Sequence, residues 1–420
     1  MKILAPRLET FGSKIRALSR VEWEDSDRPP GDVSFETESE AAEGFEAAAE
    51  AFTVLCALSA RRKGERRIRV EAPFCPRLRD GLDRAFQILE AWFPNPRRRP
   101  PPRIESPRGV RARLPPSPRA AAFVSGGLDS IGLILDNRRD YSPGHPRFFR
   151  DGIFLCGVTR RPETPVPHQE DLIRRQRRCV EELCRFGGLR LLPVSIDPDV
   201  LDEDRLFVRT QGHGARLAAA AHMFGFLSTV SIASSFFVGD LFPWGSHPLL
   251  DTCFSSGSLE VRHDGIGRRR LELVQALARR KEVLKFLMVC SEGPVAEGAV
   301  NCGRCEKCVR TMLELEIAGV LTEAESFPSR RMRAEDIDAI PPPEWSLSFW
   351  RELAEPLRAK GRRDLDAAVA RLLQRGARHR DWIEERGVRG RMRRFDRELL
   401  GGRIFAARRF LGDSRRRRSK

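Results

Sequence analysis

Apolar residues in the middle of the chain occur in short runs that alternate with longer amphipathic stretches. The short runs predict strands at residues 120–124, 152–158, 189–196 and 229–233, with further strand candidates at 259–261 and 284–289. The amphipathic stretches predict helices that end near residue 137, span 169–186 and 215–227, and lie near 270–280. Because strands alternate with helices, we expect an α/β domain over residues 119–322, with a parallel sheet covered on both faces.

The two flanks of this region have different patterns. The first 118 residues contain strand-like runs at 33–37 and 67–71 and helical patterns at 41–60 and 78–92, and they end in a Pro- and Arg-rich stretch from 94. Residues 1–118 are therefore predicted to form an α+β accessory domain with a linker. Residues 323–420 are predicted to form a helical, Arg-rich region, with helical patterns at 345–360, 362–375 and 378–385.

A glycine-rich hexapeptide, SGGLDS at residues 125–130, directly follows the first predicted strand of the α/β domain and precedes a predicted helix. Glycines let backbone N–H groups approach an anion closely, and a helix N-terminus adds partial positive charge. The pattern predicts a phosphate-binding loop, although it lacks the lysine of a Walker loop. The alternative is an ordinary turn in which Asp129 or Ser130 caps the helix.

Four cysteines in residues 290–308 have a spacing that is typical of metal sites. Cys302, Cys305 and Cys308 form a C-x-x-C-x-x-C run, and Cys290 precedes it. Four thiolates complete a tetrahedral zinc site with no open position, which is typical of a structural metal. The alternatives are an iron–sulfur cluster and free thiols. Bacterial ferredoxin spacing requires a fourth cysteine three residues further on, followed by proline, where Met312 and Leu313 stand.

The hexapeptide resembles the SGGxDS signature of the PP-loop ATP pyrophosphatases, a superfamily with the HUP-type fold of the adenine nucleotide alpha hydrolases. The resemblance implies that ATP is bound by Ser125, Gly126, Gly127, Asp129 and Ser130, with Asp129 as a Mg²⁺ contact and Asp129 and Ser130 in the reaction. With the four cysteines and Arg310 behind the loop, the pattern is most similar to the cyano-deazaguanine synthases of the queuosine pathway. That resemblance covers about residues 119–318.

The stretch 239–251 is a candidate for substrate contacts, because it is rich in glycine, proline and aromatic residues and follows the carboxyl end of a predicted strand. Asp240 is a candidate ligand for a metal or a substrate amine, and His247 is a candidate proton shuttle near neutral pH. The alternative is a turn with Asp240 bonded to its own backbone and His247 exposed. His263 is expected in a turn, and Cys156 is expected to be a buried core cysteine.

Composition adds limits on partners and compartment. The chain has 420 residues and a formal charge of +16, but only eight of its 75 basic residues are lysine. Such a skew toward arginine can reflect coding composition, so a nucleic-acid partner is considered but not favoured. Ten cysteines favour reduced thiols and metal ligation over disulfides. Residues 1–13 lack the apolar core of a signal peptide, and 217–238 are predicted to be a helix and a buried strand, not a membrane span. A cytoplasmic protein is expected.

Three functional hypotheses follow. The leading one is an ATP-dependent ligase that uses ATP, Mg²⁺ and a structural Zn²⁺, adenylates the carboxylate or carbonyl oxygen of a small acid, releases pyrophosphate, and transfers the acid to ammonia or an amine. The second is a PP-loop enzyme that modifies tRNA or a nucleoside; a thiolase of this kind would need Cys156 as its sulfur carrier. The third is a non-catalytic ATP-binding module that docks a protein partner through its N-terminal domain.

Overall fold

The computed structural model describes residues 1–94, 100–109, 118–156, 166–201, 204–290, 295, 299–343 and 345–383. The chain divides into two compact units, Met1–Cys302 and Gly303–Lys420. The Arg-rich end beyond residue 383 and much of the Pro- and Arg-rich stretch (95–99 and 110–117) lie outside the described residues.

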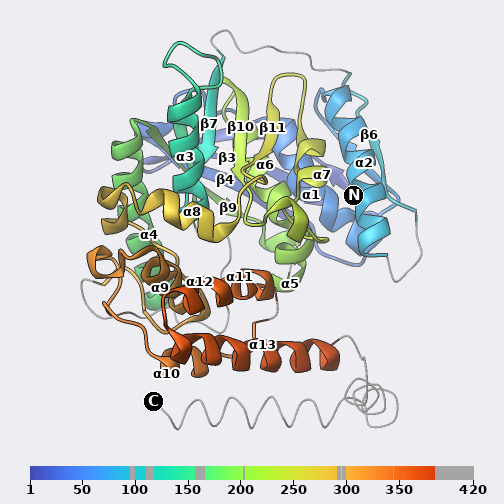
Figure 1. The fold of residues 1–420 in the computed structure, drawn as a ribbon. Helices are drawn as coiled ribbons and strands as arrows, with labels where there is room; N and C mark the ends of the chain where they lie inside the picture. The colour runs from blue at the N-terminus through green and yellow to red at the C-terminus, as the bar shows by residue number, and fades with distance from the viewer. Residues whose placement is uncertain are drawn as a thin grey trace. The chain divides into compact units, whose positions relative to one another are not determined.

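A single sheet forms the framework of the first unit (Figure 1). Among the described residues it has eleven strands, in the spatial order β11-β10-β7-β8-β9-β4-β3-β1-β5-β6, with β2 paired to β3. In chain order they are β1 (Lys2–Ile3), β2 (Arg7–Phe11), β3 (Lys14–Glu22), β4 (Gly31–Glu38), β5 (Arg67–Val70), β6 (Arg103–Glu105), β7 (Arg119–Phe123), β8 (Phe149–Cys156), β9 (Arg190–Asp197), β10 (Leu227–Ala233) and β11 (Glu260–Asp264).

The five strands from β7 to β11 form the parallel α/β part that the sequence predicts. Neighbouring strands pair in parallel throughout β11-β10-β7-β8-β9. The chain leaves β7 toward β8 and β9 and then returns to the other side of β7 to form β10 and β11. The strand order therefore reverses between β7 and β10, which makes this pair the topological switch point of the sheet.

Helices cover both faces of this parallel part. They are α3 (Leu128–Asp140), α4 (Val166–Gly187), α5 (Arg205–Phe207), α6 (His213–His222), α7 (Pro248–Asp251) and α8 (Arg270–Leu277). Helix α3 contacts α4, α8, β7 and β10, whereas α6 contacts α7, β8 and β10. The apolar runs of the strands are buried between these layers, with Ala121, Ile153, Val194 and Val230 fully shielded from solvent. The predicted helix and strand within 217–238 are confirmed as α6 and β10.

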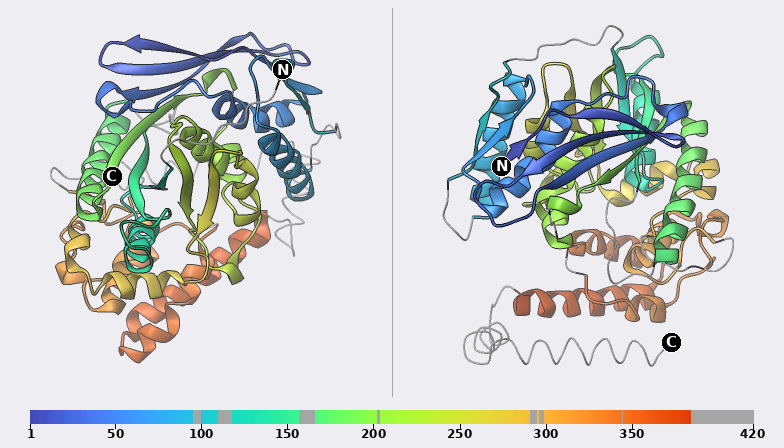
Figure 2. Two further views of the ribbon diagram at one scale, coloured as in Figure 1. Left: turned by 90° about the horizontal axis from the view of Figure 1, so that it is seen from above. Right: turned by 180° about the vertical axis from the view of Figure 1, so that it is seen from behind.

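The N-terminal strands extend the same sheet and do not form a separate one (Figure 2). Strand β4 pairs antiparallel with β9, where Phe35 lies opposite Ile196. The Thr37 hydroxyl donates to the Pro193 carbonyl at 2.7 Å. Helices α1 (Ala49–Lys63) and α2 (Pro76–Trp92) complete this part, and α1 contacts α6. The expected accessory region 1–118 thus shares one core and one sheet with the α/β region.

The second unit is helical in its described residues, as expected for this part of the chain. Its helices are α9 (Glu306–Ala318), α10 (Ala334–Asp338), α11 (Leu347–Arg351), α12 (Ala354–Ala359) and α13 (Arg363–Ile383). The carboxylate of Glu306 joins α9 to α11, accepting from Ser346 Oγ (2.7 Å) and Trp350 Nε1 (2.9 Å). Two predicted helices merge into α13, in which Gly376 lets Leu347 of α11 approach the helix backbone closely.

Two predicted elements differ from the structure. The strand candidate at 284–289 is wrong: a short 3₁₀ turn, η6 (Lys281–Lys285), leads into an irregular segment whose N–H groups bond outside any sheet. The helix expected at 41–60 begins only at Ala49. The chain before it is held by a β-bridge from Phe45 to Phe224 and by a bond from Glu46 N–H to the Met223 carbonyl. Among the described residues, no helix combines the length and apolarity that a membrane crossing needs.

Candidate functional site

The SGGLDS loop (residues 125–130) connects the carboxyl end of β7 to α3, as the sequence predicts. Gly126 has φ of +75°, a left-handed conformation that a residue with a Cβ adopts at a cost. Gly127 is the N-cap residue of α3, and no side chain caps the helix there. In an ordinary turn, the side chain of Asp129 or Ser130 would cap the helix by accepting from a first-turn N–H group. The structure has no such side-chain cap at α3.

Two serines of the SGGLDS loop bond to the loop itself. The Gly127 N–H donates to Ser125 Oγ (3.3 Å), and the Ser130 hydroxyl donates to the Gly127 carbonyl (2.9 Å). The two hydroxyl oxygens lie 3.3 Å apart. Ser125 is exposed while Ser130 is buried. The loop is thus held in shape by its own side chains, with Ser125 exposed to solvent and Asp129 half-buried.

The SGGLDS loop lies at the switch point between β7 and β10, where ligands of open parallel sheets bind. A hollow is present at this edge of the sheet. It is lined by Asp129 and Asp136 of α3, by residues 234–236 after β10, by Asp264 of β11, and by Arg268 and Arg270. The sequence predicts Asp129 at this place, but it gives no sign of the other groups around it.

Three consecutive arginines before and at the start of α8 each pair with a different carboxylate, and two of these carboxylates line the hollow. Arg268 forms two contacts with Asp136, one of them at 3.3 Å. Arg270 Nη1 lies 3.4 Å from Asp129 Oδ1. Arg269 Nη1 lies 3.5 Å from Asp240 Oδ2, and its guanidinium stacks over the Phe237 ring at 4.4 Å. The structure therefore links both predicted acidic residues, Asp129 and Asp240, to one short arginine segment.

Asp240 is half-buried at the end of a 3₁₀ turn, η4 (Val238–Asp240), that follows β10. Nearby, Phe236, Phe242 and Trp244 form a cluster of edge-on and tilted rings, with Phe236 and Phe242 centroids 4.9 Å apart. Phe236 also lines the hollow. The aromatic residues that marked 239–251 as a candidate substrate loop thus gather beside the carboxylates.

His247 occupies a different place from the other predicted site residues. It is the N-cap residue of α7, where its Nδ1 accepts from the Leu249 N–H at 3.1 Å. Its ring is buried and packs edge-on against Trp92 of α2, with centroids 4.8 Å apart. Burial, and secondarily the nearby His263, lowers the pKa of His247 below its usual value. The structure gives His247 a capping role and does not place it on the hollow that Asp129 lines.

His263 forms a buried polar group that the sequence analysis did not identify. It lies near the end of β11, not in a turn, and its Nδ1 is 2.7 Å from Asp251 Oδ2. The same oxygen accepts from the Ser246 hydroxyl at 2.7 Å. Asp251 is fully buried, and Gly214 packs against its Oδ1 so closely that a Cβ there would lie 1.9 Å away. This group ties α6, α7 and β11 together.

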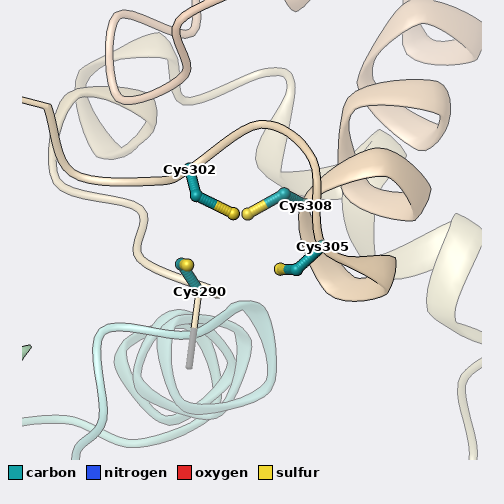
Figure 3. A group of neighbouring side chains, drawn as sticks. All are labelled: Cys290, Cys302, Cys305 and Cys308. Atoms are coloured by element: carbon teal, nitrogen blue, oxygen red, sulfur yellow. The ribbon is translucent and has the colours of Figure 1, made fainter. Parts of the chain in front are cut away.

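The four predicted metal ligands come together (Figure 3). The sulfurs of Cys290, Cys302, Cys305 and Cys308 all lie within 4.8 Å of one another. Zinc with four thiolates at about 2.3 Å holds its sulfurs about 3.8 Å apart, so these sulfurs suit a single tetrahedral ion. An iron–sulfur cube would hold them farther apart. The group can therefore bind a metal ion such as zinc.

Local structure explains why these cysteines are presented together. Gly303, between the first two cysteines of the run, has φ of +69° and packs against Pro328, so the chain can turn sharply there. Cys305 is the N-cap residue of α9, and Cys308 lies in its first turn. Cys290 and Cys308 are buried, while Cys302 and Cys305 are half-buried.

A buried asparagine, which the sequence analysis missed, positions Cys290. Asn301 Oδ1 accepts from the N–H groups of Val289 (2.9 Å) and Cys290 (3.0 Å), and its Nδ2 donates to the Leu287 carbonyl (2.8 Å). These bonds replace the sheet pairing that the strand prediction at 284–289 assumed. The sequence holds one sign of this role, which is that Asn301 directly precedes Cys302. Metal ligands are commonly supported by hydrogen bonds from residues beside them.

The same segment supports the SGGLDS loop. The Met288 N–H donates to the Gly126 carbonyl at 2.9 Å. Met288 lies between Leu287 and Val289, both of which bond to Asn301. A short stretch of backbone therefore connects the left-handed glycine of the SGGLDS loop to the first of the four cysteines.

Cys156 is the last residue of β8 and is half-buried. Burial raises the pKa of its thiol to about 12. Because the thiolate is the nucleophilic form, this cysteine is a poor sulfur carrier at neutral pH. Cys156 is thus half-buried at the end of its strand, and not fully buried as expected of a core cysteine.

Comparison with protein-family models, with curated proteins and with solved structures finds no match for this chain.

Proposed function

We propose that this chain is an ATP-dependent, AMP-forming ligase of the PP-loop type. In this reaction the SGGLDS loop binds the β and γ phosphates of ATP, and an oxygen of a small acid attacks the α phosphate. Pyrophosphate leaves, and ammonia or an amine then displaces AMP from the adenylated acid. The protein would act by positioning and by neutralising charge, as in other phosphoryl-group chemistry.

One observation carries this proposal: a left-handed glycine and an uncapped helix start lie together at the switch point of a parallel sheet. Backbone N–H groups in such a loop suit phosphate oxygens, and the helix dipole adds to the attraction. Asp129 lies in the first turn of α3 and would hold the Mg²⁺ that accompanies a triphosphate. The acid and the nitrogen donor would enter on the side of the aromatic residues that follow β10.

ATP–pyrophosphate exchange tests the proposal. The full-length protein is loaded with zinc and incubated with MgATP, labelled pyrophosphate and a panel of candidate acids. We expect exchange with the correct acid, and Asp129→Ala should lower its rate by at least 100-fold. Asp140→Ala is the matched control, because Asp140 lies at the opposite end of α3, is exposed and pairs with the neighbouring Arg139. A wild-type protein that does not bind MgATP would refute the proposal, whereas binding without exchange would favour the non-catalytic module.

We further propose that the four cysteines hold a structural zinc ion. Four thiolates leave no open position for substrate, and such sites contribute on the order of 10 kcal/mol of apparent binding free energy to local folding. The tRNA-thiolase alternative has less support, because the thiol that it needs, Cys156, has a raised pKa. Cys156→Ser should therefore leave the exchange rate within a factor of two of the wild type.

A further inference from the structure

The arginine triplet at residues 268–270 connects the SGGLDS loop to the loop after β10 through three ion pairs of unequal quality. Arg268 approaches Asp136 with two nitrogen–oxygen contacts, which is the geometry of a strong paired interaction. The pairs of Arg270 with Asp129 and of Arg269 with Asp240 are single contacts of 3.4 and 3.5 Å. Charge-assisted bonds usually measure about 2.7–2.9 Å, so these two pairs are weaker.

Three carboxylates line the hollow, Asp129, Asp136 and Asp264, and each pairs with an arginine of the segment from β11 to α8. Arg262 pairs with Asp264 at 2.9 Å, and Asp136 also pairs with Arg139 at 3.1 Å. A triphosphate that arrives here meets carboxylates that repel it, unless a cation covers them.

Among the three arginines of the triplet, Arg270 is best placed to exchange its carboxylate partner for a phosphate. Its side chain is only 9% exposed, whereas that of Arg269 is 47% exposed. It begins α8, which contacts α3, and it shares the hollow with Asp129. A guanidinium in this position has the planar set of donors that binds two phosphate oxygens at once. Burial strengthens each such contact, because water competes less.

We propose that Arg270 is a triphosphate-binding residue that Asp129 holds in place while the site is empty. When MgATP binds, Mg²⁺ takes Asp129, and the guanidinium of Arg270 moves from the carboxylate to the phosphate oxygens. Arg268 stays on Asp136 and anchors the segment. This inference rests on the proposed function and adds a residue that neutralises the triphosphate.

The exchange of partners predicts effects of opposite sign for two variants. Calorimetry on the zinc-loaded, full-length protein would measure two affinities. The first is for MgATP, and the second is for inorganic triphosphate in a buffer that contains neither magnesium nor EDTA. Arg270→Ala should weaken both affinities at least tenfold, and Arg270→Lys should weaken them less. Asp129→Asn should bind metal-free triphosphate at least threefold more tightly, because the carboxylate that competes with the phosphates for Arg270 is gone, yet bind MgATP more weakly.

Arg280→Ala is the matched control, since Arg280 follows the far end of α8 and is 62% exposed. Its affinities should stay within a factor of two of the wild type. The inference is overturned if Arg270→Ala binds MgATP within a factor of two of the wild type, or if Asp129→Asn binds metal-free triphosphate no more tightly. The Asp129→Asn measurement decides the matter if Arg270→Ala does not fold. If the wild-type protein binds no MgATP, the proposed function is refuted, and this inference is refuted with it. In the other contrary outcomes, only this inference is overturned.

Discussion

At the scale of single residues, a few side chains and one left-handed glycine hold the chain in shape in and around the candidate sites. Gly126 supplies the left-handed turn of the SGGLDS loop. Asn301 holds the backbone on both sides of Cys290, and Asp251 holds His263. Asn301 and Asp251 are buried, so replacing either one leaves the groups that it bonds without that partner.

Gly126→Ala should lower ATP affinity while leaving the fold intact. The nearest atom to an added Cβ is Cys179 Cβ at 3.4 Å, which is an ordinary contact. The cost therefore comes from the left-handed backbone and is about 1–2 kcal/mol. Thermal unfolding and ATP titration would measure the two effects. Gly188→Ala is a suitable control, because Gly188 also has positive φ (60°) and has no atom near an added Cβ. An unchanged ATP affinity in Gly126→Ala would contradict the role given to this glycine.

His247 should make the protein less stable as the pH falls below about 6.5. Burial holds its pKa in the folded state below that of the unfolded chain, so the unfolded chain binds more protons in this window. His247→Asn keeps a side-chain acceptor for the cap and removes the titrating group. Melting temperatures measured from pH 8 to 5 should fall less steeply for this variant. A slope equal to that of the wild type would show that His247 does not contribute.

At the scale of elements, the irregular segment 286–290 connects two sites that the sequence presents separately. Its Met288 N–H supports the Gly126 carbonyl, and its next two N–H groups are held by Asn301. A strand at this place would use those N–H groups for sheet pairing and leave the SGGLDS loop without this support. The departure from regular structure is therefore what allows the segment to serve both sites.

Asn301→Ala should weaken metal binding by about 10- to 100-fold, the range typical of supporting residues around metal ligands. Zinc release to a chromogenic chelator would measure it. The matched control is Asn137→Ala, since Asn137 is also buried and also bonds backbone groups, those of Arg147 and Phe149. That variant should lose stability without releasing zinc faster. Equal release rates in the wild type and Asn301→Ala would contradict the positioning role.

At the scale of the whole molecule, the first unit is built on one continuous sheet. Strand β4 joins the antiparallel N-terminal strands to the parallel ones through β9, and the core residues of both parts form one cluster. The N-terminal strands therefore cover an edge of the α/β sheet that would otherwise offer unpaired backbone groups. Removing them should destabilise the proposed nucleotide site as well as the N-terminal region.

Metal removal should also weaken nucleotide binding. In the proposed zinc site, Cys290 would lose a ligand bond when a chelator extracts the ion, and the segment that ends at Cys290 supports Gly126. We expect MgATP affinity to fall several-fold after zinc extraction and to recover when zinc is restored. The MgATP affinity is titrated with magnesium in excess in both forms of the protein. An apo protein that binds MgATP as well as the zinc form would show that the two sites are independent.

The sequence by itself determined the features that depend on neighbouring residues. Periodic apolar runs indicated the five parallel strands, the glycines of 125–130 indicated a loop before a helix, and the cysteine spacing indicated the metal ligands. Tertiary structure alone decided which distant residues meet. The sheet order that creates the switch point, the pairing of Arg268–Arg270 with three carboxylates, the bonds of Asn301 and the burial of His263 all join residues that are not neighbours in the chain. Such contacts follow from how packed elements share a core, and no local period in the sequence records them.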